Sequence, residues 1–144
     1  MTPLTVKIWH NVRTDGEGRH PAFCDGYTPG DPMVCVFTYQ TAPRGRSLQQ
    51  IADHAYAVFN GHPCDDEGER LAGQYYGRRL RSVSAGDVVS MGEAALAVGR
   101  PAGWVPVTGS LHEVRTDEHG THPLPGPGLL PGTPAISPGK EPGA

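Results

Sequence analysis

The uneven distribution of proline and glycine is the feature of this sequence that most limits what the chain can fold into. Residues 121–144 contain seven prolines and five glycines, so these two residue types make up half of the segment. Such a segment has few apolar side chains to bury, and burial is what offsets the entropy lost on ordering a chain. The sequence therefore predicts one folded domain over residues 1–110 and a disordered, Pro/Gly-rich tail over residues 111–144.

Alternating apolar side chains predict most of the strands in the folded part. Every second side chain of residues 4–9 is a valine, isoleucine or leucine, which is typical of a half-buried strand. Residues 33–39 are apolar on both faces, which indicates a strand inside the sheet. Further strands are predicted as a hairpin over 88–91 and 94–98, at a sheet edge over 103–107, and as a short piece over 22–23.

One segment carries strong helix signals. Ser47 and Gln50 match a capping box, and the apolar residues that follow recur at helical spacing as far as Phe59. A second, shorter helix is expected over about residues 67–76. The predicted fold class is α+β, with a small, mostly antiparallel sheet of about five strands and one main helix over residues 48–59 packed on it.

Charge, cysteine content and hydropathy exclude several classes of protein. Twelve Lys and Arg against 15 Asp and Glu give a net charge of −3, which does not attract nucleic acid over the whole molecule. The apolar runs are much shorter than the roughly 20 residues that span a bilayer, and residues 1–10 do not resemble a secretory signal. Three cysteines argue against a disulfide framework. We therefore expect a cytoplasmic protein without membrane association.

The segment over residues 82–89 is predicted to form a turn that leads into a strand. Gly86 can adopt a positive φ, and Asp87 can accept hydrogen bonds from backbone amides of the turn. Ser82 and Ser84 are suited to bonding the same amides, and neither lies in a nucleophile elbow.

The order of these segments resembles that of a known family. A helix ending in Phe59-Asn60 leads to the Tyr/Arg-rich residues 74–81, then to the turn of residues 82–89, a hairpin and Gly103-Trp104. This arrangement resembles the YodL-like family and its actinobacterial relatives, with Val83 in place of the usual Leu and Ala85 in place of the usual Val. The resemblance implies no particular activity. It implies a small protein of the kind often carried on plasmids and other mobile elements.

A basic, aromatic segment is the strongest candidate for a binding surface. Basic side chains interleaved with aromatic rings can hold a phosphate backbone and stack bases, and tyrosine and arginine are also enriched in protein–protein hot spots. Alternatively, the tyrosines pack on the sheet and the arginines pair with the acidic residues 65–69. The residues concerned are Arg70, Tyr75, Tyr76, Arg78, Arg79 and Arg81.

Two further sets of residues include side chains that can bind metal ions. His20, Cys24, His62 and Cys64 include the ligand types of tetrahedral zinc, but their spacing matches no zinc-binding pattern. The acidic residues 65–69 could bind a divalent cation, although a solvated loop is the simpler interpretation. We therefore expect no metal site and no cofactor.

No catalytic constellation stands out. Asp53 and His54 are adjacent on the predicted helix and point in different directions, so they do not form a dyad, and no glycine-rich phosphate loop is present. The sequence favours a non-enzymatic, cytoplasmic accessory or binding protein with an unknown protein partner, from a plasmid or phage context. The alternative is a nucleic-acid-binding module that uses the Arg/Tyr segment.

Overall fold

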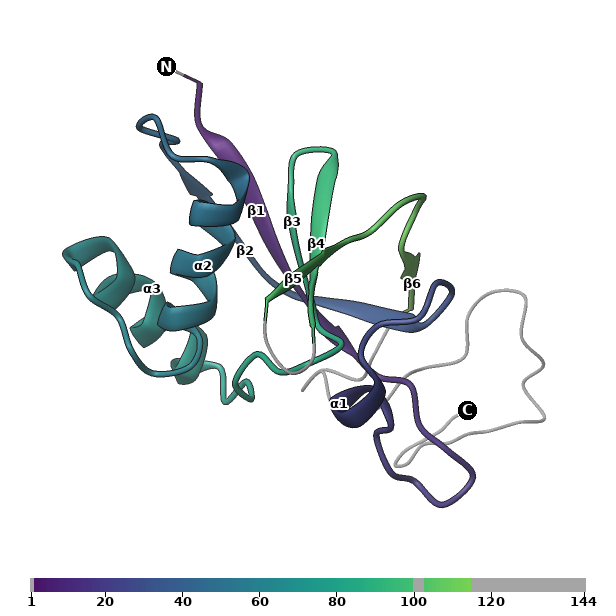
Figure 1. Ribbon diagram of the computed structural model, residues 1–144. Helices are drawn as coiled ribbons and strands as arrows, with labels where there is room; N and C mark the ends of the chain where they lie inside the picture. The colour runs from purple at the N-terminus through teal and green to yellow at the C-terminus, as the bar shows by residue number, and fades with distance from the viewer. Residues whose placement is uncertain (1, 100–102, 115–144) are drawn as a thin grey trace.

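The computed structural model describes residues 2–99 and 103–114 of the chain. Within these residues, six strands form one sheet in the order β5-β4-β3-β1-β2-β6 (Figure 1). Only the pairing of β2 with β6 is parallel in this described part, and the other pairings are antiparallel. The strands are β1 (Leu4–Asn11), β2 (Pro32–Thr41), β3 (Val88–Met91), β4 (Ala94–Val98), β5 (Trp104–Pro106) and β6 (His112–Glu113). The predicted α+β class is confirmed, with a mixed sheet and one strand more than expected.

Two helices of similar length, rather than one main helix, lie on the same side of the sheet (Figure 1). Helix α2 (Leu48–Val58) begins with the predicted capping box, in which Ser47 accepts from Gln50 N and the Gln50 side chain accepts from Ser47 N. Helix α3 (Asp66–Gly77) is capped at its N-terminus by Asp65, whose side chain accepts from Gly68 N. No helix of the described residues is long and apolar enough to span a bilayer.

The strand predicted over residues 22–23 is wrong, because these residues belong to the short helix α1 (Ala22–Asp25). Pro21 adopts helical dihedral angles immediately before α1, and its carbonyl oxygen accepts from the backbone N–H groups of Cys24 and Asp25. Proline suits the first turn of a helix because its φ is already helical and it needs no N–H partner there. Pro21 is therefore a helix-start signal that the predicted strand did not take into account.

The main core lies between the sheet and the two helices. The predicted apolar stripe of α2 is buried from Ile51 to Phe59, whereas Leu48 at its start is exposed. Four aromatic rings from β2, α2 and α3 meet there, with centroid separations of 4.4 Å for Phe59 and Tyr75 and 5.4 Å for Phe37 and Phe59. Tyr39 is the fourth ring, 5.9 Å from Phe59. This cluster ties both helices to the middle of the sheet.

The opposite face of the sheet carries a smaller apolar cluster that includes Trp9, Met33 and Val88. Val107 and Leu111, from the segment that follows β5, pack against it. Strand β6 continues this segment beyond the predicted domain boundary at residue 110, and residues 115–144 of the predicted tail lie outside the described residues.

The turn before β3 has the predicted geometry and carries an ion pair whose carboxylate is buried. Gly86 has a φ of 91°, and Asp87 Oδ2 accepts from Ser84 N at 2.8 Å. Asp87 is fully buried, and its two oxygens also accept from the two terminal nitrogens of Arg81 at 2.7 and 2.9 Å. The backbone N–H of Asn11 donates to Asp87 Oδ1 at 2.8 Å. Asp87 therefore joins β1, the end of α3 and the start of β3.

A buried histidine makes the stability of this fold dependent on pH. His10 is 4% exposed, and burial, only partly opposed by the negative charge of Asp87, lowers its pKa from 6.5 to about 4. As pH falls below 6.5 the unfolded chain takes up a proton that folded His10 does not, so stability is full above 6.5 and declines toward 4. We expect His10 to account for a loss of about 2 kcal/mol between pH 7 and pH 5.

The measurement is urea unfolding of the wild type and of His10→Gln at both pH values. The carboxylates titrate alike in the two proteins, so the difference between their pH dependences isolates His10. Equal pH dependences would contradict the assignment.

Candidate functional site

The first aromatic residue of the predicted Arg/Tyr surface belongs to the core. Tyr75 is fully buried, and its ring packs on Phe37 and Phe59. Its hydroxyl donates to the carbonyl oxygen of Arg81 at 2.6 Å and lies 2.7 Å from His10 Nε2. No face of the Tyr75 ring is left on which a nucleic-acid base could stack.

Three further members of the segment are also bound within the protein. The half-buried Tyr76 donates through its hydroxyl to the carbonyl oxygen of Phe59 at 2.7 Å. Arg78 donates to the carbonyl oxygen of Val36 at 2.6 Å, and Arg81 pairs with Asp87. These contacts attach the end of α3 to β2 and to the turn before β3.

Arg70 and Arg79 are the exposed members whose side chains form no hydrogen bond within residues 2–99 and 103–114. Arg79 has a φ of 60° and follows the last turn of α3, where its N–H donates to the carbonyl oxygen of Tyr76. A left-handed residue at this place commonly ends a helix. The structure therefore does not gather the six predicted residues into one surface patch.

The two histidines and two cysteines of zinc-ligand type, His20, Cys24, His62 and Cys64, are not brought together either. Among the described residues, one group of His, Cys, Asp and Glu side chains is close enough to hold a metal ion, and it contains none of His20, Cys24, His62 and Cys64. Cys24, Cys35 and Cys64 are free thiols.

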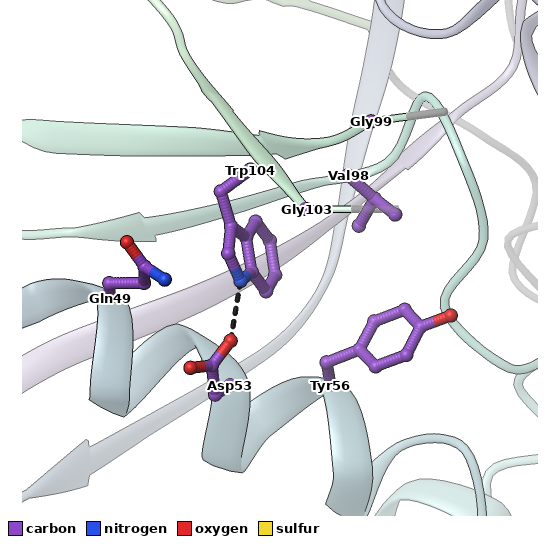
Figure 2. Close-up of a pocket in the computed structure, with 7 residues that line it drawn as sticks. All are labelled: Gln49, Asp53, Tyr56, Val98, Gly99, Gly103 and Trp104. Atoms are coloured by element: carbon purple, nitrogen blue, oxygen red, sulfur yellow. Dashed lines mark hydrogen bonds between the residues drawn. The ribbon is translucent and has the colours of Figure 1, made fainter. Parts of the chain in front are cut away.

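A pocket with an unusual lining lies between α2 and the edge of the sheet formed by β4 and β5 (Figure 2). Its volume is about 200 Å³. One wall consists of Gln49, Asp53 and Tyr56, which are spaced four and three residues apart and so lie on one face of α2. The other wall includes Trp104, the first residue of β5. The lining residues are Gln49, Asp53, Tyr56, Val98, Gly99, Gly103 and Trp104.

Two aromatic rings and a carboxylate define the chemistry of this pocket. Trp104 Nε1 donates to Asp53 Oδ1 at 2.6 Å, and Tyr56 stands almost perpendicular to Trp104 with 6.2 Å between ring centroids (Figure 2). Tyr56 is 40% exposed, which is high for a large aromatic side chain. Aromatic faces attract cations, and a carboxylate retains acceptor capacity after one hydrogen bond. The pocket is suited to a guanidinium or an ammonium group.

Comparison with protein-family models, curated proteins and solved structures finds no match to this chain. The candidate site therefore depends on the geometry of the molecule itself.

In the sequence, Asp53 is tested only as a dyad partner of His54, Trp104 is predicted in an edge strand, and Tyr56 is not a candidate site residue. One signal was present, because Gln49, Asp53 and Tyr56 are spaced four and three residues apart and so fall on one face of the predicted helix. The contribution of Trp104 could not be read from the sequence, since it lies 51 positions from Asp53.

A second hollow, of about 590 Å³, lies on the face of the sheet away from the helices. Its lining includes Lys7, Glu93 and Ser110, and its one aromatic residue is Trp9. Trp9 is only 7% exposed, and its indole donates to Ser90 Oγ at 2.9 Å. This hollow offers no comparable set of accessible rings.

Proposed function

We propose that the protein is a non-enzymatic binding protein that holds a basic side chain of a protein partner in the pocket between α2 and β5. The observation that carries this proposal is the contact of Trp104 with Asp53 beside the exposed ring of Tyr56. The hydrogen bond fixes the orientation of the indole before any partner arrives, which reduces the entropy lost on binding.

The size and charge of the pocket support a side chain as its occupant. A volume of about 200 Å³ is below the roughly 300–1,000 Å³ of typical small-molecule sites, and it suits the end of an arginine or lysine side chain. The net charge of −3 favours a basic partner. Tryptophan and tyrosine are also the residue types that most often dominate protein–protein interfaces.

The use of the buried polar groups supports a binding role over catalysis. Asp87, Arg81 and the backbone N–H of Asn11 satisfy one another. The hydroxyl of Tyr75 is bound to His10 and to Arg81. These groups hold the fold together, and they line neither the pocket between α2 and β5 nor the second hollow.

Nucleic-acid binding has weaker support as an alternative. It would depend mainly on Arg70 and Arg79, because Tyr75 is buried and Arg81 is paired with Asp87. We also propose a cytoplasmic location, supported by the three free thiols, and a mobile-element context, supported by the resemblance to the YodL-like family.

The proposal is tested with short Gly/Ser peptides that carry one arginine, one lysine or one glutamate, observed through the Trp104 indole N–H signal in NMR spectra. We expect basic peptides to shift this signal and the glutamate peptide to leave it unchanged. Asp53→Asn retains an acceptor for the indole but removes the charge, so it should weaken binding of the basic peptides by about tenfold, or about 1.4 kcal/mol.

Glu93→Gln is the matched control, because it removes one exposed carboxylate from the other hollow and changes the net charge equally. Equal loss of binding in Glu93→Gln and Asp53→Asn would show that only net charge matters and would reject the pocket. Single-stranded and duplex oligonucleotides are titrated in parallel at low salt. Tighter binding of these than of the basic peptides would favour the nucleic-acid alternative.

A further inference from the structure

A second group of side chains lies where α2 and α3 pack together on the same side of the sheet (Figure 1). His54 projects from α2, Asp65 precedes α3 and Glu67 lies in its first turn. One ligand atom from each residue lies within 4.8 Å of the other two. The acidic residues 65–69 are recognisable in the sequence by themselves, and the structure adds a histidine from a different helix.

The distances suit a single small metal ion. His54 Nε2 lies 3.1 Å from Asp65 Oδ2 and 3.2 Å from Asp65 Oδ1. Two ligands at about 2.1 Å from one tetrahedral zinc ion lie about 3.4 Å from each other, so His54 and Asp65 are already at a suitable spacing. A carboxylate oxygen of Glu67, the third ligand, lies within 4.8 Å of both.

Each carboxylate is held in place by a neighbour. Asp65 accepts from Gly68 N at 2.6 Å, which fixes its side chain at the start of α3. Glu67 Oε2 accepts from Thr41 Oγ1 at 2.8 Å, and Thr41 is 5% exposed. Outer partners of this kind orient metal ligands and typically affect metal affinity 10–100-fold.

A separate observation at the same place is an unpartnered hydroxyl. Tyr39 is 7% exposed, and its hydroxyl has no hydrogen-bond partner among the described residues. It lies two positions before Thr41 on β2, so both side chains point toward the helices. Thr41 on that face contacts Glu67 at 2.8 Å, and burial, followed by the negative charge of Glu67, raises the pKa of Tyr39. A water molecule bound to a metal ion at Glu67 would supply the missing partner.

We propose that His54, Asp65 and Glu67 form a zinc site that links α2 to α3. One imidazole nitrogen and two carboxylates are ligands that zinc accepts, and they leave a position for water. The two carboxylates would attract the ion. Arg46 donates to Thr41 Oγ1, and its positive charge would reduce this attraction. This proposal does not depend on the proposed function, because the pocket of Trp104 uses none of these residues.

The test titrates the full-length protein with zinc alone, in competition with a chromophoric chelator. We expect the tightest site to bind one zinc ion. Glu67→Gln and Asp65→Asn preserve an acceptor for Thr41 and for Gly68 respectively, so they should leave the metal-free fold intact. Each should weaken this site by about 100-fold or more, and Thr41→Val by about tenfold.

His62→Ala is the matched control, because His62 is exposed and lies close in sequence to Asp65 without belonging to the group. It should bind zinc like the wild type. Zinc should also raise the melting temperature of the wild type and of His62→Ala, but not of Glu67→Gln. Zinc binding that is unchanged in Glu67→Gln and Asp65→Asn, or that is lost in His62→Ala, would overturn the assignment.

Discussion

Replacement of Phe59 by alanine is expected to lower the free energy of unfolding by about 3–5 kcal/mol, which is typical of a fully buried phenylalanine. Phe59 has no exposed surface, and its ring packs against Phe37, Tyr39 and Tyr75. These three neighbours come from β2 and α3, while Phe59 itself ends α2. Alanine would leave a cavity where three elements meet, and rings attached to separate elements cannot easily close it.

Urea unfolding followed by circular dichroism measures this loss, with Phe59→Leu as the matched variant. Leucine retains most of the buried volume, so its cost should be well below that of alanine. If alanine costs less than about 1 kcal/mol, the stripe of α2 does not form the core in solution, because fully buried aromatic rings are worth several times more.

The elements predicted correctly are those with strong local signals. The capping box of Ser47 and Gln50 set the start of α2, and its predicted end at Phe59 differs from the observed one by a single residue. The hairpin of β3 and β4 has the predicted bounds. In both cases the determining residues are neighbours in the sequence, so a single sequence is sufficient.

The elements that were missed depend on distant parts of the chain. Strand β6 pairs with the start of β2, through His112 beside Pro32 and Glu113 beside Met33. A two-residue strand has no alternation to detect, and it exists only because β2 offers an open edge. The burial of Tyr75 was one of two alternatives in the sequence, because a tyrosine near arginines can face either the core or the solvent until the position of α3 is known.

Both proposed sites join residues that the sequence keeps apart. Trp104 reaches Asp53 from another element, and His54 meets Asp65 and Glu67 only because α2 and α3 pack together. The acidic residues 65–69 are recognisable in the sequence, but the sequence does not show which histidine comes close to them, and His54 is not among the four His and Cys candidates.

Asp87→Asn is expected to cost about 3 kcal/mol, the lower end of the usual effect of removing one partner from a buried ion pair, because Asp87 is buried but Arg81 is partly exposed. Asp87 is fully buried and accepts from both terminal nitrogens of Arg81 and from the backbone N–H groups of Asn11 and Ser84. Every partner is a donor, so an amide NH₂ must point at one of them. The substitution therefore keeps the volume of the side chain but leaves donors without an acceptor, and it removes the charge that balances Arg81.

A double-mutant cycle with Arg81→Met separates the ion pair from the backbone contacts, with free energies of unfolding measured in urea for all four proteins. If the charge of Arg81 carries the cost, Asp87→Asn should be less harmful in the Arg81→Met background, with a coupling free energy of about 1–3 kcal/mol. Arg81 is about one-third exposed, so water can partly solvate it when Asp87 is removed, and this keeps the expected coupling below the full cost. A coupling near zero would assign the whole effect to the amides of Asn11 and Ser84, and the turn rather than the ion pair would then be the reason for an aspartate at this position.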